Sequence, residues 1–122
     1  MSRKTVLAVD DSSTVLLSEQ LFLSRAFQVV SARDGLEGLE KARALRPDLI
    51  LLDVVMPRLD GLEACRRLRE DEATSGIPII LVTTRGELDS LEAGYEAGCS
   101  DYVTKPFNGP ELLAKVRSLL GE

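Results

Sequence analysis

The stretch LILLD, residues 49–53, is a short aliphatic run that stops at a carboxylate. The same arrangement recurs along the chain: TVLAV at 5–9 is followed by Asp10 and Asp11, IILV at 79–82 by Thr83, and YVT at 102–104 by Lys105. If these runs are parallel strands, their carboxyl ends lie at one edge of one sheet. The sequence therefore predicts that three carboxylates, a hydroxyl and an ammonium group meet at that edge.

Short β-branched or aliphatic runs alternate with longer segments of helical period, so that a strand is followed by a helix five times. The expected strands are residues 5–9, 28–32, 49–52, 79–82 and 101–104. The first, third and fourth are almost continuously apolar, as in strands covered on both faces by helices, whereas the second and fifth contain polar residues and are expected at the edges. This pattern predicts a single α/β domain over residues 1–122, with a (βα)5 flavodoxin-like, doubly wound parallel sheet of strand order 2-1-3-4-5.

Helix starts are marked at three places by a capping residue with a glutamate three positions later. The pairs are Asp34 with Glu37, Asp60 with Glu63, and Asn108 with Glu111. The first helix is expected at about 13–25, and its apolar side is assigned to Leu16, Leu17, Leu21 and Phe22. The fourth helix, at about 88–97, contains Gly94 and few large apolar residues, so it is expected to be the least stable one.

The composition excludes several classes of function. A net charge of -5 argues against general nucleic-acid binding, which requires a basic surface. No segment approaches the roughly 18 apolar residues of a membrane span. The apolar stretch near the N-terminus is too short for a signal peptide, so a cytoplasmic protein is expected. The chain contains no histidine, which removes Ser-His-Asp and Cys-His catalysis and any role as a phosphohistidine carrier.

The three carboxylates expected at the sheet edge repel one another unless their pKa values rise or a cation binds between them. Oxygen ligands without histidine or cysteine favour a hard divalent ion, which indicates Mg2+. A divalent ion and an ammonium group beside a carboxylate suit phosphoryl transfer, because the transition state spreads negative charge over three oxygens. Asp53, which ends the central strand, is the expected nucleophile. Lys105 would hold one phosphoryl oxygen, the Thr83 hydroxyl another and the metal a third.

Four motifs resemble those of bacterial two-component response-regulator receiver domains, and in particular the chemotaxis-type regulators. They are VDDSSTV at 9–15, LLDVVMPRLDG at 51–61, LVTTRG at 81–86 and DYVTKPF at 101–107. Asp53 precedes Thr83 by 30 positions and Lys105 by 52, which fits the layout of that family. The resemblance extends over essentially the whole chain.

This resemblance implies that Asp10 and Asp11 organise Mg2+, with Asp11 expected as the direct ligand, joined by Asp53 and the main-chain carbonyl of Val55. Asp53 would accept a phosphoryl group from the phosphohistidine of a sensor histidine kinase or phosphotransfer protein. The Lys105-Pro106 peptide bond would be cis, as is typical of the family.

The resemblance also implies a switch formed by Thr83 and Tyr102. The phosphate would draw the hydroxyl inward and the aromatic ring would fill the vacated space. The output surface would comprise the fourth helix, the fifth strand and the fifth helix, and it would bind a downstream effector protein or domain.

The leading interpretation is a signalling module rather than an enzyme, one that assists only its own phosphorylation and dephosphorylation. A Mg2+-dependent phosphohydrolase would need a cap or a long loop to build a substrate pocket, and the sequence has neither. A flavin binder is disfavoured because the acidic crevice would repel the flavin phosphate. A receiver that signals without phosphate is disfavoured by the intact acidic set and Lys105. Both a stand-alone regulator and the receiver of a longer protein remain compatible with the sequence.

Overall fold

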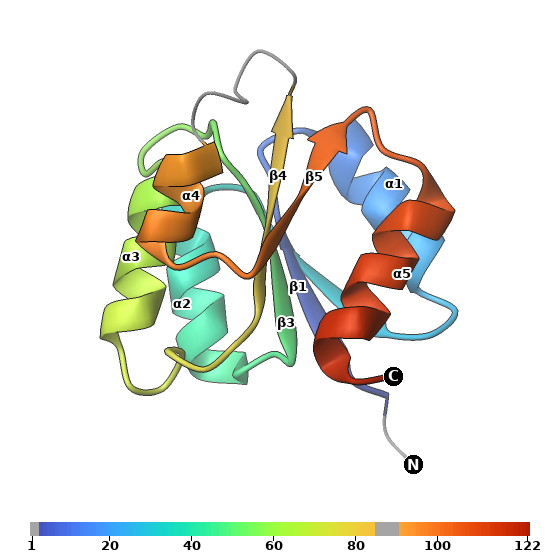
Figure 1. The fold of residues 1–122 in the computed structure, drawn as a ribbon, viewed down its shortest axis with the longest axis horizontal. Helices are drawn as coiled ribbons and strands as arrows, with labels where there is room; N and C mark the ends of the chain where they lie inside the picture. Colours follow the sequence, from blue (N-terminus) through green and yellow to red (C-terminus); the bar gives the residue numbers. More distant parts are fainter. Residues whose placement is uncertain (1–2, 85–90) are drawn as a thin grey trace.

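The structure, a computed structural model, describes residues 3–84 and 91–122 and consists of five strands alternating with five helices in that part of the chain (Figure 1). The strands are β1 (Thr5–Val9), β2 (Gln28–Ala32), β3 (Leu49–Asp53), β4 (Ile79–Thr84) and β5 (Asp101–Lys105). The helices are α1 (Ser13–Leu23), α2 (Gly35–Leu45), α3 (Gly61–Glu70), α4 (Leu91–Ala97) and α5 (Gly109–Leu120). The predicted order of elements is confirmed.

All five strands are parallel and lie in the order β2-β1-β3-β4-β5, which confirms the predicted doubly wound sheet. The central strands β1, β3 and β4 are buried almost throughout, whereas most residues of β2 and β5 at the edges are partly or fully exposed. Strands β3, β4 and β5 each continue one or two residues beyond the predicted end. The reason is continued pairing at this edge, where Asp53 lies opposite Val82 and Thr84 opposite Lys105.

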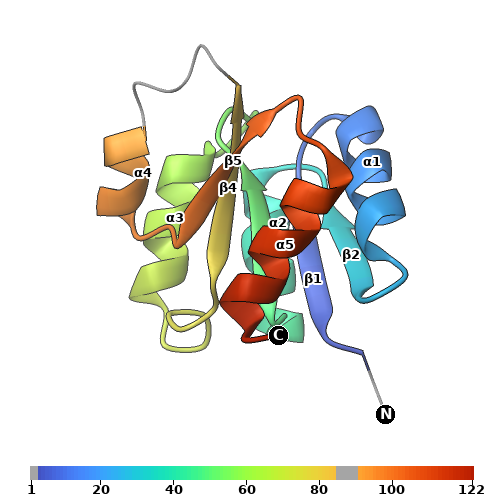
Figure 2. The same ribbon diagram turned by 45° about the vertical axis from the view of Figure 1, so that its right-hand side comes forward.

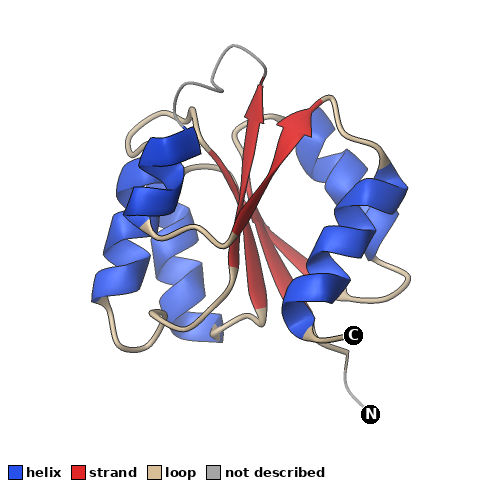
Figure 3. Cartoon of the chain, viewed as in Figure 1, coloured by secondary structure: helices blue, strands red, loops and turns tan. Residues whose placement is uncertain are grey.

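Helices cover both faces of the sheet. Figures 1 and 2 show α2, α3 and α4 on one face and α1 and α5 on the other, and Figure 3 shows the strands as a single layer between them. Each face has its own apolar core, the first built with Ala42, Cys65 and Leu68 of the covering helices and the second with Leu23 and Leu112. A three-layer arrangement of this kind buries the sheet and leaves the strand ends free to form a site.

The predicted helix caps are present. The side chains of Asp34, Asp60 and Asn108 each accept a hydrogen bond from the main-chain N–H three residues later, at 2.9, 2.9 and 2.7 Å. Helix α4 is described from Leu91, so residues 88–90 of its predicted span lie outside the described part of the chain. Within the described residues, no helix has both the length and the apolar character needed to cross a bilayer.

The predicted apolar side of α1 is wrong in part. Leu17, Leu21 and Phe22 are 56%, 67% and 43% exposed. The buried side of α1 is formed instead by Leu16, Glu19 and Leu23. Helix α1 carries apolar residues on most of its circumference, so the sequence does not mark which stripe packs inward. The consequence is an exposed apolar surface on α1 and a buried carboxyl group beneath it.

Candidate functional site

The predicted site residues lie at the carboxyl ends of four neighbouring strands. Asp10 and Asp11 follow β1, Asp53 is the last residue of β3, and Lys105 is the last residue of β5. Thr83 lies on β4, between the strands that carry Asp53 and Lys105. Because parallel strands place their carboxyl ends at one edge, residues far apart in sequence meet there.

Three of these residues form an acidic cluster. One carboxylate oxygen from each of Asp10, Asp11 and Asp53 lies within 4.8 Å of the other two. Asp10 and Asp53 are buried, at 1% and 5% exposure, while Asp11 is exposed. Such an all-oxygen set, with one side open to solvent, has the ligand chemistry that Mg2+ prefers, since this ion usually retains several of its waters. The residues present therefore fit a hard divalent cation.

Lys105, at the end of β5, contacts this cluster. Its ammonium nitrogen Nζ lies 3.0 Å from Oδ2 of Asp10 and 3.2 Å from Oδ1 of Asp53. Desolvation lowers the pKa of Lys105, but the hydrogen bonds and negative charges of Asp10 and Asp53 outweigh it, so the pKa lies above its ordinary value. The ammonium group therefore stays charged and balances two buried carboxylates.

The main chain around the cluster is held in place locally. Oδ1 of Asp10 accepts a hydrogen bond from the N–H of Ser12 at 2.9 Å, which closes the turn between β1 and α1. On the other side, the N–H of Gly61 donates to the carbonyl of Val54 at 2.8 Å. A Cβ atom at Gly61 would lie 2.2 Å from the carbonyl oxygen of Asp53, so only glycine allows α3 to start this close to the end of β3. Val55, the predicted carbonyl ligand, is exposed in the loop between these elements.

The two predicted switch residues lie on neighbouring strands. Thr83 is buried, and its hydroxyl donates to the carbonyl of Thr84 at 3.2 Å. Tyr102 is half-buried, and its ring meets Tyr95 of α4 edge to face, with 6.5 Å between the ring centroids. The ammonium of Lys115 on α5 lies 5.2 Å from the centroid of the Tyr102 ring. The ring of Tyr102 therefore connects α4, β5 and α5.

Glu19 is a residue near the site that sequence reasoning missed. It is 1% exposed, and its Oε1 atom has no hydrogen-bond partner among the described residues. Burial, together with the negative charges of Asp10 and Asp53, raises the pKa of Glu19 to about 8 against the opposing effect of Lys105. The only available signal was its spacing from Leu16 and Leu23, which places it on the same side of α1.

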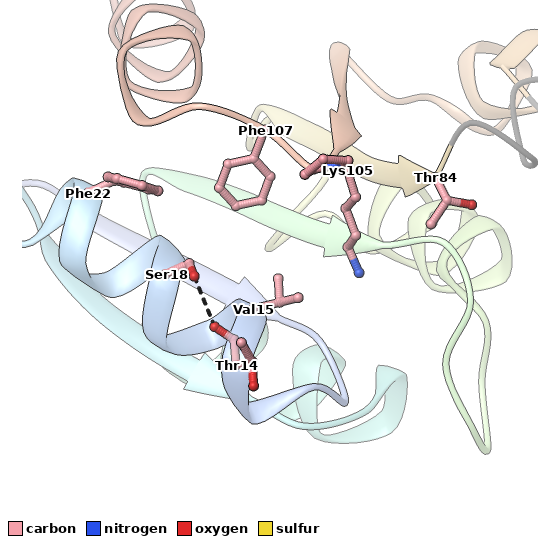
Figure 4. A pocket seen from close by; sticks show the side chains of 8 residues that line it. Thr14, Val15, Ser18, Phe22, Thr84, Lys105 and Phe107 are labelled. Atoms are coloured by element: carbon pink, nitrogen blue, oxygen red, sulfur yellow. Dashed lines mark hydrogen bonds between the residues drawn. The ribbon is translucent and has the colours of Figure 1, made fainter.

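A cavity of about 460 Å³ opens beside Lys105. It is lined by Thr14, Val15, Ser18 and Phe22 of α1 together with Thr84, Lys105, Pro106 and Phe107 (Figure 4). The rings of Phe22 and Phe107 meet edge to face at 6.2 Å and form its far wall. The Lys105-Pro106 bond is cis, as the resemblance implied. A partner that occupied this cavity would therefore lie next to the acidic cluster.

Comparisons with known proteins agree with this fold and arrangement. The profile of the response regulator receiver domain family matches residues 6–117. The chain is 47% identical over 116 residues to the transcriptional regulatory protein CseB of Streptomyces coelicolor, covering 94% of this chain and 48% of CseB. It is 41% identical over 118 residues to the alkaline phosphatase synthesis transcriptional regulatory protein PhoP of Bacillus subtilis, covering 96% of this chain and 48% of PhoP. The chain thus spans about half the length of these curated relatives.

Solved structures give the same result. The chemotaxis protein CheY4 of Vibrio cholerae superposes with a TM-score of 0.90 and 33% identity, covering 97% of this chain and 99% of CheY4. The receiver domain of a signal transduction histidine kinase from Syntrophus aciditrophicus gives a TM-score of 0.89 and 33% identity, covering 97% and 90% of the two chains. The chain belongs to the response regulator receiver domain family. Such domains are signalling modules of two-component systems, and phosphorylation and Mg2+ binding are typical of the family.

Proposed function

We propose that this chain is a phospho-accepting receiver in which Asp53 takes a phosphoryl group and thereby switches a protein-binding surface. The observation that supports this most strongly is the position of Lys105, whose ammonium bridges Asp10 and Asp53 at 3.0 and 3.2 Å. An ammonium group so placed can hold a phosphoryl oxygen on Asp53. The proposal extends to the whole of residues 1–122 as one receiver domain, acting in the cytoplasm and without direct contact to nucleic acid or membrane.

The proposed donor is the phosphohistidine of a sensor histidine kinase or phosphotransfer protein. One oxygen of the Asp53 carboxylate attacks phosphorus, the new P–O bond forms as the P–N bond breaks, and the released imidazole takes up a proton. Lys105 and the hydroxyl of Thr83 would each stabilise one phosphoryl oxygen. Asp10, Asp11, Asp53 and the main-chain carbonyl of Val55 would hold Mg2+, which would supply positive charge to stabilise the negative charge of the phosphoryl group.

Incubation with acetyl phosphate and Mg2+ is expected to add one acid-stable, base-labile phosphoryl group per chain. The label should disappear when Asp53 is replaced by asparagine, because the amide is not a nucleophile of comparable strength. Removal of Mg2+ with a chelator should abolish labelling as well. Phosphate incorporation, followed by intact mass, measures both effects.

Asp60→Asn is the matched control for this experiment, because asparagine also caps a helix and Asp60 lies outside the acidic cluster. This variant should be labelled like the wild type. Undiminished labelling of Asp53→Asn would show that the acceptor is another residue. If the wild type stays unlabelled by both acetyl phosphate and its cognate kinase, the alternative of a receiver that signals without phosphate would be favoured.

We further propose that the donor protein docks on α1 beside the cavity next to Lys105. Leu17 and Leu21 lie one helical turn apart on α1 and are both exposed, and an exposed apolar pair of this kind suits a protein contact. Leu17→Asp is expected to slow transfer from the cognate phosphoprotein about tenfold, an effect typical of an interface contact. Labelling by acetyl phosphate should stay unchanged, because that donor needs no docking surface.

Leu45→Asp provides the control, since Leu45 is also exposed but lies on α2, on the other face of the sheet. Rates of transfer from both donors, measured for the three proteins, separate docking from chemistry. Equal rates of protein-donor transfer to wild type and Leu17→Asp would place the docking surface elsewhere.

The proposed output is a switch from Thr83 to Tyr102 that changes the surface formed by α4, β5 and α5, to which an effector protein or domain would bind. The contacts of the Tyr102 ring with Tyr95 and Lys115 support this, because movement of the ring would disturb both helices. Beryllium fluoride with Mg2+, a phosphoryl mimic, is expected to shift the NMR resonances of Tyr102. Thr83→Val should still bind the mimic but should lose that response, since the hydroxyl has been replaced by a methyl group. A full Tyr102 response in this variant would exclude Thr83 as the link.

A further inference from the structure

The short connection between β2 and α2 contacts both of the loops that carry the candidate metal ligands. Residues Arg33 and Asp34 form this connection. Arg33 contacts the loop between β1 and α1, which contains Asp11. Asp34 contacts the loop between β3 and α3, which contains Val55. Neither Arg33 nor Asp34 belongs to the acidic cluster itself.

Arg33 makes the contacts with the β1–α1 loop and the start of α1. Its guanidinium group donates a hydrogen bond from Nη1 to the hydroxyl of Ser13 at 2.8 Å and another from Nη2 to the main-chain carbonyl of Asp11 at 3.2 Å. The planar guanidinium can hold two acceptors in a fixed geometry, which a lysine ammonium does less well. The contact fixes the main chain of Asp11 and leaves its carboxylate free to face Asp10 and Asp53.

Asp34 makes the contact with the β3–α3 loop. Its Oδ1 atom pairs with Nη2 of Arg58 at 3.0 Å. Arg58 has a positive φ of 68°, a conformation that is costly for residues with a side chain and that indicates a loop held by its surroundings. The same loop packs closely on the start of α2. A Cβ atom at Gly35 would lie only 2.3 Å from the carbonyl oxygen of Leu59, which shows how close the two segments are. The loop that carries Val55 is therefore anchored to the β2–α2 connection.

Arg33 and Asp34 are both hydrogen-bonded to the first turn of α2. The main-chain N–H of Arg33 donates to Oε1 of Glu37 at 2.7 Å, and Oδ1 of Asp34 accepts from the N–H of Glu37 at 2.9 Å. Glu37 pairs with Lys41 at 3.1 Å, and Lys41 in turn donates to the carbonyl of Ser31 at the end of β2. The connection is thus tied to the first turns of α2 and cannot shift independently of that helix.

We propose that Arg33 and Asp34 act as a bracket that positions the β1–α1 and β3–α3 loops for binding of a divalent cation. This inference rests on the proposed function, which places Mg2+ between these loops. For Arg33→Ala, the bracket predicts a change in Mg2+ affinity opposite in sign to that expected from simple electrostatics. Loss of the positive charge of Arg33 near three carboxylates would by itself strengthen cation binding, whereas loss of a positioning contact weakens it, because the carboxylates can then move apart.

Calorimetric titration with Mg2+ of the wild type, Arg33→Ala, Arg33→Lys and Asp34→Asn tests the bracket. Each variant is expected to bind Mg2+ about threefold to tenfold more weakly, at or below the low end of the usual effect of residues that orient metal ligands. Arg33→Lys keeps the charge, and Asp34→Asn keeps the helix cap while losing the ion pair with Arg58. Arg25→Ala is the control for net charge, since Arg25 makes no side-chain hydrogen bond or ion pair with the described residues.

A second readout separates positioning from general damage. In the acetyl phosphate reaction, the Mg2+ concentration for half-maximal rate should rise in the three variants, while the rate at saturating Mg2+ should equal that of the wild type. Unchanged or tighter Mg2+ binding by Arg33→Ala would overturn the bracket. Weaker binding by Arg33→Ala alone, with Arg33→Lys and Asp34→Asn unchanged, would overturn it too. A wild type that binds no Mg2+ would instead refute the proposed function itself, and the bracket with it.

Discussion

Lys105→Met is expected to lower the free energy of unfolding of the metal-free protein by about 2 to 3 kcal/mol, because it leaves buried carboxylates without a counter-charge. The ammonium of Lys105 lies 3.0 Å from Asp10 and 3.2 Å from Asp53, both of which are buried. The cost is placed below that of a fully enclosed ion pair because Lys105 is still in part exposed. Urea unfolding in the presence of a chelator measures this change.

Addition of Mg2+ should restore most of the stability lost in Lys105→Met. The proposed ion would bring positive charge to the same carboxylates and would bind the folded state alone, so it would stabilise that state by mass action. The gain from Mg2+ should therefore be larger for the variant than for the wild type.

Lys4→Met serves as the control, since Lys4 forms an exposed pair with Glu122 and its loss should cost less than about 1 kcal/mol. If metal-free Lys105→Met unfolds at the same urea concentration as the wild type, Lys105 does not balance the acidic cluster.

Glu19→Leu is expected to remove a pH dependence of stability that the wild type shows between about pH 4.5 and pH 8. The unfolded chain releases the proton of Glu19 near the ordinary glutamate pKa of 4.5, whereas burial keeps the carboxyl protonated in the folded state up to a pKa of about 8. Over this window the folded state binds more protons, so stability is full below pH 4.5 and falls as the pH rises.

The decrease in the free energy of unfolding between pH 4.5 and pH 8 follows from the shift in the pKa of Glu19. At about 1.4 kcal/mol for each pKa unit, the total is about 3 to 5 kcal/mol. The groups that act on this carboxyl are Asp10, Asp53 and Lys105, and they are present in both proteins. The difference between wild type and Glu19→Leu, measured by urea unfolding at pH 5 and pH 8.5 without metal, therefore isolates Glu19.

Glu40→Leu makes the same substitution at an exposed position of α2 and should leave the pH dependence as it is in the wild type. Parallel stability curves for wild type and Glu19→Leu across this pH range would show that Glu19 has no raised pKa.

The strands and the core of the site could be predicted because both depend on local patterns combined with one topological rule. Apolar runs such as that before Asp53 identify buried strands, and parallel pairing then brings their ends together. The helix starts at Asp34 and Asp60 could be predicted equally well, because a cap acts within four residues. The strand ends were placed too early, since the pairing that extends them depends on the neighbouring strand.

Other features could not be predicted because they depend on contacts between distant segments. Helix α1 is apolar on most of its surface, so no local pattern indicates that Glu19 is buried and that Leu17 and Leu21 are exposed. The contacts of Arg33 and Arg58 join loops whose conformation, including the positive φ of Arg58, has no signature in their composition.

Asp53 is the proposed acceptor, and chemical mapping of the phosphoryl group tests this assignment without relying on a variant. After reaction with acetyl phosphate and Mg2+, treatment with borohydride reduces an aspartyl phosphate to homoserine, and peptide mass spectrometry then locates the altered residue. The predicted result is homoserine at position 53 alone, in an amount equal to the phosphate incorporated. Modification at position 10 or 11, or phosphate on a hydroxyl group such as that of Thr83, would show that Asp53 is not the sole acceptor.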